Sequence, residues 1–406
     1  MKGSPLAAIF LVVLVDVFGM TLVLPLLAPY AERFHATPFQ ATLLVSTYAA
    51  CMLMAGPVLG ALSDRFGRKP LLIVSQIGTL IGFVLLARAE TLAMLFFARA
   101  LDGATAGNLS LAQAYVSDRT PPEKRTGAFA LIGIAFGLGF FIGPAITASL
   151  LRFGYTAPIW LAAAMSATSI VCSIALLEGG MPPKDTDATR RLSPLAWGTY
   201  APYFSKPIVG VLLLEYLMYT LSFSAFTSGF ALFAERTYRW HNVLFTPREV
   251  GYVFAYAGFL GIMVQGGALR RLVPRFGESR LIRIGFAGNV LGYGVLAAFP
   301  SIAGLFAACT ITSIANAMLR PSLTSVVSQR SEASEQGLIL GLLQSLSSVG
   351  AIVAPMLAGK LIEHGYLAGW AALPAVFSLI ALVLSRKGSG LIKHPPELAP
   401  ANSPST

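Results

Sequence analysis

Charged residues are scarce in this chain. Of its 406 residues, only 12% are Asp, Glu, Lys or Arg, whereas 55% are hydrophobic. Soluble domains carry roughly 25% charged residues, so this composition excludes an ordinary soluble enzyme as well as a disordered chain. A helix needs ~20 apolar residues to cross a bilayer core of about 30 Å, and the chain has room for a dozen such helices. We therefore expect a membrane protein.

Residues that bind metals or form disulfides are equally rare. The three cysteines, Cys51, Cys172 and Cys309, lie far apart inside apolar runs, and the four histidines show no metal-ligand spacing. No metal site, disulfide framework or cofactor is predicted. No Walker-type Gly-Lys-Ser/Thr segment supports ATP-driven pumping, and no Ser-His-Asp pattern or paired carboxylates indicate an enzyme. ATP is therefore not predicted to be the energy source.

Twelve apolar segments follow one another along the chain. They cover residues 6–29, 40–62, 70–88, 92–117, 127–150, 157–177, 208–234, 248–269, 281–299, 302–328, 337–361 and 367–385. Because lipid offers the backbone no hydrogen-bonding partner, each segment is expected to be a helix. This predicts an all-α membrane protein with twelve transmembrane helices in two pseudosymmetric bundles. The expected divisions are an N-terminal six-helix bundle (1–178), a cytoplasmic linker (179–206), a C-terminal six-helix bundle (207–386) and a disordered cytoplasmic tail (387–406).

Lys and Arg are distributed unevenly between the two sides of these spans. If both termini are cytoplasmic, 19 of the 29 Lys and Arg residues fall on the cytoplasmic side and 7 on the other. Basic residues favour the cytoplasmic side, so this orientation is predicted. The bias accounts for most of the net charge of +11, and no nucleic-acid partner is expected. Compact loops favour the lipid bilayer of a cell inner membrane as the location of the protein. The protein is expected to be a monomer there.

The two halves of the sequence repeat one another. Segments 60–71 and 267–281 share a Gly-Ala-Leu start and an Arg-Phe-Gly centre. Beyond them, glycines recur at offsets of 210 and 211 in the pairs Gly78 and Gly288, Gly82 and Gly292, and Gly154 and Gly365. Two related bundles predict a substrate cavity at their interface, near the membrane midplane, as in secondary transporters.

Residues 60–69 carry the most specific pattern in the chain, and they resemble the signature loop of the major facilitator superfamily. Glycines there permit a very short turn between two helices, and charges beside them can hold one conformation closed. The resemblance implies a cytoplasmic gate made of Gly60, Asp64, Arg65, Gly67 and Arg68, together with Asp118 at the end of the fourth span. The alternative is that the basic residues only anchor the topology, which explains neither the spaced glycines nor the acid.

The resemblance extends over nearly the whole chain. Residues 99–103 are similar to the intramembrane arginine motif of the family. The helix-packing residues Gly133, Gly137, Gly139, Gly143 and Pro144 resemble the glycine-proline motif of proton-coupled drug antiporters, although Thr147 and Ala148 replace its trailing glycines. Within the superfamily, residues 16–25 and 335–343 are most similar to tetracycline/proton antiporters. This likeness implies proton-coupled export.

One departure limits what the resemblance implies about the substrate. Tetracycline exporters carry essential acids in the third and ninth spans, where this chain has Gly82 and Asn289. Tetracycline itself is therefore poorly supported as a substrate.

Three acids lie inside predicted spans, namely Asp16, Asp102 and Glu215. Asp16 is ten residues beyond Leu6, roughly 15 Å along a helix and near the midplane. A charge there costs about 3 kcal/mol unless it faces protein or water. These acids and Arg99, three residues before Asp102, are the proton-coupling candidates. The alternatives are a packing role for Asp16, a permanent ion pair between Arg99 and Asp102, and a Glu215 that snorkels to the surface.

Polar and aromatic residues of the central spans are candidates for the substrate cavity. Tyr219, Phe223 and Phe226 form a stripe at helical spacing, although such residues also face lipid or neighbouring helices. Arg320 either fixes an anionic group or reaches the interface. The candidates are Gln113, Tyr219, Phe223, Phe226, Asn289, Asn316, Arg320 and Gln344.

The sequence thus favours a proton-coupled antiporter that exports amphipathic drugs or small metabolites by alternating access. A proton symporter or facilitator for sugars or organic acids would share the gate loop but not the glycine motif of the fifth span. A transport-inactive receptor or scaffold would have no evident need for acids at midplane depth.

Overall fold

The computed structural model of the protein describes residues 5–119, 122–177, 197–330 and 336–392, and almost all of them are helical. The N-terminal half contains α1 (Pro5–Val23), α2 (Leu27–Glu32), α3 (Pro38–Phe66), α4 (Arg68–Ala87), α5 (Leu92–Ala104), α6 (Asn108–Arg119), α7 (Pro122–Leu150), a 3-10 turn (Leu151–Phe153) and α8 (Ala157–Leu176). The C-terminal half contains α10 (Pro207–Thr237), α11 (Pro247–Met263), a π-helical segment (Val264–Ala268), α12 (Leu269–Phe276), α13 (Glu278–Ala298), α14 (Ile302–Gln329), α15 (Gln336–Glu363) and α16 (Leu367–Ile392). A two-residue antiparallel hairpin, β1 (Arg239–Trp240) and β2 (Val243–Leu244), joins α10 to α11.

Ten helices in the described part of the chain are long and apolar enough to cross a membrane. The first and fourth predicted spans differ from the prediction. The first ends at Val23 instead of residue 29, because the chain turns at Pro25 before α2, and proline lacks the backbone N–H that a helix needs. The fourth is broken at residues 105–107 into α5 and α6. Hydropathy runs through both breaks, so it does not reveal them.

The predicted linker and tail are partly helical. Residues 197–205 form a short helix, α9 (Trp197–Ser205), within the segment predicted as a linker, whereas residues 178–196 lie outside the described ranges. Helix α16 continues to Ile392, past the predicted boundary at residue 386, because no proline intervenes before Pro395. The remainder of the tail, residues 393–406, is also outside the described ranges.

The two halves make the same turns at the positions that the sequence repeat pairs. Among the described glycines, four have a positive φ: Gly67 (96°) and Gly277 (73°), and Gly154 (111°) and Gly365 (76°). Gly67 and Gly277 lie at corresponding turns, between α3 and α4 in one half and between α12 and α13 in the other. Gly154 and Gly365 likewise lie just before α8 and α16. Only glycine adopts such angles without strain, so these residues fix the sharp turns of the duplicated unit.

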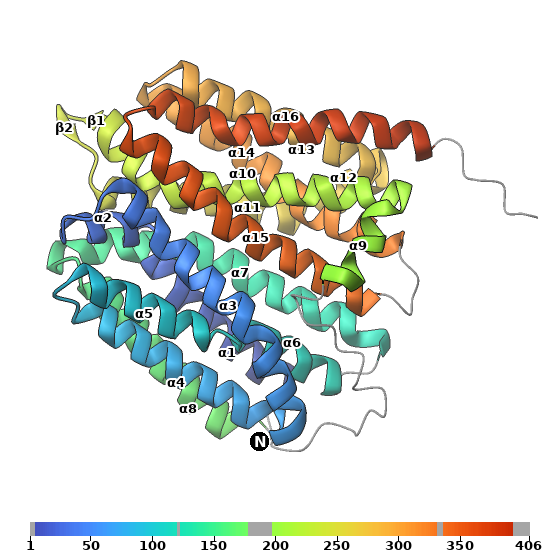
Figure 1. The fold of residues 1–406 in the computed structure, drawn as a ribbon, viewed down its shortest axis with the longest axis horizontal. Coiled ribbons are helices and arrows are strands. Elements are labelled where there is room, and N and C mark those ends of the chain that lie inside the picture. Colours follow the sequence, from blue (N-terminus) through green and yellow to red (C-terminus); the bar gives the residue numbers. More distant parts are fainter. Residues whose placement is uncertain (1–4, 120–121, 178–196, 331–335, 393–406) are drawn as a thin grey trace, which may run out of the picture.

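The halves meet along two pairs of helices, α3 with α15 and α7 with α11 (Figure 1). We call the left end of the molecule in Figure 1, which carries α2 and the β1–β2 hairpin, the α2 end, and the opposite end, where α3 turns into α4, the Gly67 end.

Among the residues whose burial is described, the apolar core is shared by the two halves only toward the α2 end. One cluster there combines Tyr30 and Phe83 of the N-terminal half with Phe230 and Trp370 of the C-terminal half. Two further large clusters belong to one half each, the first to α9, α10 and α13–α16 and the second to α1, α3, α4 and α6–α8. Burial of apolar area is the main force that holds such elements together, so the halves are joined at the α2 end.

Polar contacts between the halves also gather near the α2 end. Ser46 of α3 donates a hydrogen bond to the Ile352 carbonyl of α15 at 2.7 Å, and Arg236 of α10 pairs with Glu32 of α2. By contrast, Gly56 and Gly60 of α3 have no atom within 4 Å of where a Cβ would lie. The interface helix α3 is therefore closely packed toward the α2 end and loosely packed toward the Gly67 end.

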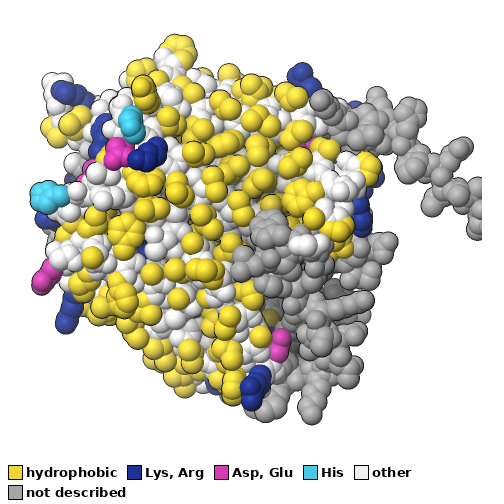
Figure 2. Space-filling model, in the orientation of Figure 1, with side chains coloured by type: hydrophobic (Ala, Val, Ile, Leu, Met, Phe, Trp, Pro, Cys, Tyr) yellow, Lys and Arg dark blue, Asp and Glu magenta, His cyan; other side chains and the backbone are white. Residues whose placement is uncertain are grey.

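The surface agrees with a membrane-embedded bundle. In Figure 2 a broad apolar face covers the middle of the molecule, and charged side chains gather at the left edge and toward the right. Single charges in the middle of such a face are costly in lipid, which explains their position at the two ends.

Candidate functional site

Asp16 lies in α1 among polar side chains from two other helices. Gln76 of α4 and Ser169 of α8 both face its carboxyl group, and Gln76 donates a hydrogen bond to the Ser169 hydroxyl at 2.6 Å. Both of these partners are fully buried. Within the described residues, the Asp16 Oδ1 and Gln76 Oε1 atoms are buried without a hydrogen-bond partner.

These two orphaned oxygens are both acceptors. An ionised Asp16 carboxylate can only accept hydrogen bonds, so it can supply no donor to either oxygen. A protonated Asp16 carboxyl has an O–H that can donate a hydrogen bond. The Asp16 environment thus has the polar groups to hold a proton on this side chain.

Arg99 and Asp102 of α5 form the ion pair that their spacing predicts. Their nearest N and O atoms are 2.7 Å apart, and the side chains are only 12% and 7% exposed. The Arg99 guanidinium also lies 4.3 Å from the ring centre of Tyr48 in α3, and Thr79 of α4 faces the Asp102 carboxylate. Asp16 and Asp102 are close enough to interact electrostatically. The structure therefore brings Asp16, Arg99 and Asp102 into one polar site, the N-half acid cluster.

Sequence reasoning missed several members of this cluster. Gln76 stands out as a polar residue inside an apolar span and was visible in the sequence. Tyr48 and Ser169 were not, because their role depends on how α3 and α8 pack against α1 and α5. Gly82, where tetracycline exporters have an acid, packs against the pair, since a Cβ added there would lie 2.8 Å from the Asp102 Cβ.

The break between α5 and α6 directly follows this ion pair. Ser75 of α4 accepts a hydrogen bond from the Gly107 backbone at 2.9 Å and donates one to the Thr105 carbonyl. These bonds satisfy backbone groups that the missing helical turn would leave unpaired. Interrupted helices at membrane depth are typical of transporter binding sites.

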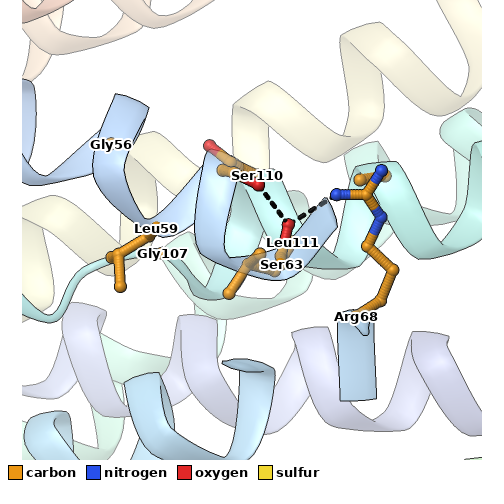
Figure 3. Close-up of a pocket in the computed structure, with 9 residues that line it drawn as sticks. Gly56, Leu59, Ser63, Arg68, Gly107, Ser110 and Leu111 are labelled. Atoms are coloured by element: carbon orange, nitrogen blue, oxygen red, sulfur yellow. Dashed lines mark hydrogen bonds between the residues drawn. The ribbon is translucent and has the colours of Figure 1, made fainter. Parts of the chain in front are cut away.

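The predicted gate loop is compact, and its charges have separate roles. Arg68 is 4% exposed and pairs with Asp64. Its guanidinium also donates a hydrogen bond to the Ser63 hydroxyl (Figure 3). A cavity of about 170 Å³ lies beside them between α3 and α6, lined in part by Gly60 and Gly107. Arg65 instead lies over the neighbouring Phe66 ring at 5.3 Å. The side chain of Asp118, the sixth predicted gate residue, lies outside the described residues.

Lys69 of the same loop ties two helices together. Its Nζ donates hydrogen bonds to the Ile174 and Leu177 carbonyls at the end of α8, at 2.8 and 2.6 Å. A cation at a helix C-terminus satisfies carbonyls that have no partner within the helix and interacts well with the helix dipole.

Alanine substitutions at the two glycines of the gate loop are expected to have opposite effects on stability. Gly67→Ala should cost about 1–3 kcal/mol, because φ 96° and ψ 153° are available essentially only to glycine. Gly60→Ala serves as the matched control and should be neutral or stabilising, because position 60 is helical and its Cβ meets open space. Thermal unfolding of the purified variants measures both effects. Equal melting temperatures for Gly67→Ala and Gly60→Ala would contradict the conclusion that the backbone conformation at position 67 requires glycine.

The predicted glycine motif of α7 packs this helix against α1 of its own half and against α11 of the other half. Gly139 and Gly143 leave no room for a Cβ against Val17 and Thr21 of α1, and Gly137 contacts Ile262 of α11. Gly258 of α11 in turn packs against the α7 backbone at Phe140. Pro144 lies within α7, as does Gly133, about whose surroundings the structure gives nothing.

The predicted cavity residues of the C-terminal half separate into two groups. Tyr219 and Phe223 stack, with ring centres 6.1 Å apart and planes 21° apart. Phe226 instead packs among Phe230, Phe254, Tyr293 and Trp370 in the shared apolar cluster, so it belongs to the core.

The polar residues of the predicted cavity are arranged as a short ladder. Asn289 is fully buried and donates to the Asn316 Oδ1 at 3.0 Å, and Asn316 donates to the Tyr293 hydroxyl at 3.4 Å. Gln113, Arg320 and Gln344 have exposed side chains. Glu215 is 2% exposed and does not reach the surface, and it joins no ion pair among those described. It therefore lies apart from the N-half acid cluster.

Known proteins share both the sequence pattern and the fold. The family model of the Major Facilitator Superfamily matches residues 9–302 and 268–404. The chain is 28% identical to the tetracycline resistance protein, class B, of Escherichia coli, covering 87% of each chain. It is 25% identical to multidrug resistance protein 2 of Bacillus subtilis (strain 168), covering 87% of this chain and 89% of the relative. The crystal structure of the human organic anion transporter MFSD10 (TETRAN) superposes with a TM-score of 0.71 at 23% identity, covering 94% and 98% of the two chains.

Together, the duplicated helical bundles, the glycine-rich loop and these matches identify a multi-pass membrane protein that is not an enzyme. The chain is a secondary transporter of the major facilitator superfamily.

Proposed function

We propose that this transporter is a proton-coupled antiporter that exports amphipathic drugs or small metabolites. The observation that carries the proposal is the N-half acid cluster, in which the Asp16 Oδ1 atom is buried and the Arg99–Asp102 pair is largely buried within the predicted spans. Acids are rare inside membrane spans and mark proton relays and substrate routes. Relatives named as tetracycline and multidrug resistance proteins support an export function.

The proposed mechanism is alternating access between the two halves. The Lys and Arg bias supports an orientation in which the Gly67 end faces the cytoplasm and the protein lies in a cell inner membrane. In that orientation the shared apolar cluster at the α2 end would seal the outer side, so we interpret the conformation as inward-facing. In the gate loop, the Arg68–Asp64 pair would close the cytoplasmic side in the opposite state.

Proton transfer in this scheme follows from the hydrogen-bonding capacity of Asp16. A protonated carboxyl suits the inward-facing state, because the buried Asp16 Oδ1 has no hydrogen-bond donor and an ionised carboxylate would leave this charged atom unsatisfied. Release of that proton to the cytoplasm would leave an ionised Asp16 beside Asp102, and the repulsion between them would favour the binding of substrate and the return step. Glu215 is a second candidate carrier in the other half.

Everted membrane vesicles test this proposal. After respiration acidifies the lumen, addition of rhodamine 6G or fluorescein to the outside should raise the lumenal pH, because an exporter carries substrate in and protons out. A symporter would produce no such rise, since no substrate is present in the lumen. The triple variant Asp16→Asn, Asp102→Asn, Glu215→Gln should abolish the rise. Unchanged proton movement in that variant would refute the assignment of these acids.

A further inference from the structure

Arg320 is an intramembrane cation in an unusual position. It lies nine residues before the end of α14 at Gln329, about 13 Å along the helix axis. Its side chain is exposed, and none of the ion pairs among the described residues includes it. An arginine at this depth is costly unless it meets water, an acid or a bound anion.

The neighbours of Arg320 belong to the interior of the bundle rather than to the lipid face. Tyr219 of α10 is 5% exposed, and its hydroxyl lies within electrostatic range of the Arg320 guanidinium. Asn316, one helical turn before Arg320, is held by Asn289 and Tyr293 of α13. Arg320 therefore projects beside α10 at the end of a polar ladder.

The two halves differ in how these arginines are neutralised. Arg99 of the N-terminal half is nearly buried and pairs with Asp102, whereas Arg320 is exposed and has no described acid partner. Glu215, the buried acid of the C-terminal half, shows no ion pair with it. Among the described residues, Arg320 thus presents a positive charge without a carboxylate partner near the Tyr219 hydroxyl, and the Tyr219 ring stacks on Phe223.

From this charge we infer the substrate class, an inference that rests on the proposed transport function. We propose that Arg320, Tyr219 and Phe223 form a subsite for an aromatic, amphipathic substrate that carries an anionic group. A guanidinium matches a carboxylate or sulfonate through two parallel hydrogen bonds. The adjacent rings offer an apolar platform for the aromatic part of the substrate. A cationic drug would instead meet an unfavourable like charge.

Two dyes with the same xanthene scaffold and opposite charge test the subsite. Fluorescein is anionic and rhodamine 6G is cationic, and anisotropy measures the binding of each to the full chain in phosphatidylcholine nanodiscs, with empty nanodiscs as blanks. The ratio of the two dissociation constants is compared between variants. Partition of each dye into the nanodisc lipid is the same for every variant, so it cancels in this comparison. Arg320→Gln should shift this ratio about tenfold or more against fluorescein, because a charge-assisted hydrogen bond is lost. Arg320→Lys keeps the charge and should shift it less.

Arg330→Gln is the matched control, because Arg330 is an exposed arginine at the end of the same helix. Its ratio should equal that of the unmodified protein. The subsite is refuted if Arg320→Gln and the unmodified protein bind fluorescein equally, whether both bind it or neither does. Since binding is measured at equilibrium without a proton gradient, a failure of proton coupling in vesicles would leave this result unaffected.

Discussion

Asp102→Asn is expected to abolish proton-coupled transport and to lower the free energy of unfolding by about 3 kcal/mol. The loss of stability arises because Arg99 stays charged and almost buried after its partner is neutralised, and a buried charge without its counterion is strongly destabilising. Thermal unfolding of the purified protein and proton movement in everted vesicles measure the two effects separately.

The double variant Arg99→Gln, Asp102→Asn distinguishes a structural ion pair from a functional one. Removing both charges leaves no buried ion, so most of the lost stability should return. Proton movement should stay absent, because an ionised Asp16 no longer meets the negative charge of Asp102 that favours the return step. A double variant that couples protons normally would show that the pair only positions α5.

Gly359→Ala is expected to stop transport almost completely. Gly359 of α15 packs against the fully buried Thr42 of α3, where an added Cβ would contact the Thr42 hydroxyl and would lie 2.8 Å from the Phe39 Cα. Because Phe39 Cα is a backbone atom, the helices themselves would have to give way. The variant would hold α3 and α15 apart at the α2 end, so this end could not close during transport.

Dye transport in everted vesicles measures this effect. Gly341→Ala in the same helix is the matched control, because a Cβ there would make only an ordinary contact with the Tyr200 hydroxyl at 3.6 Å. The control should transport dye at the normal rate. Normal transport by Gly359→Ala would contradict the closure of this end during the transport cycle.

Much of the architecture follows from the sequence alone. Long apolar runs and the glycine repeat predict the membrane helices and the duplicated halves, because each run is set by the thickness of the bilayer. The capping sequences Thr37-Pro38-Phe39-Gln40 and Thr246-Pro247-Arg248-Glu249 repeat this duplication and mark the starts of α3 and α11. Sequence reasoning overlooked them, although both contain a recognisable capping box.

The candidate site was less accessible from the sequence. The Arg99–Asp102 pair is local, three residues apart on one helix, so its spacing predicts the contact. The partners of Asp16 come from α4 and α8, and no local pattern records that packing. Phe226 shows the same limit, because helical spacing groups it with Tyr219 and Phe223, whereas tertiary packing places it in the core.

The close approach of Gly82 to Asp102 constrains which residues position 82 can hold. An aspartate there would place its Cβ 2.8 Å from the Asp102 Cβ, so α4 and α5 would have to move apart. The acid that tetracycline exporters carry in their third span and the Asp102 side chain therefore compete for the same volume between these two helices.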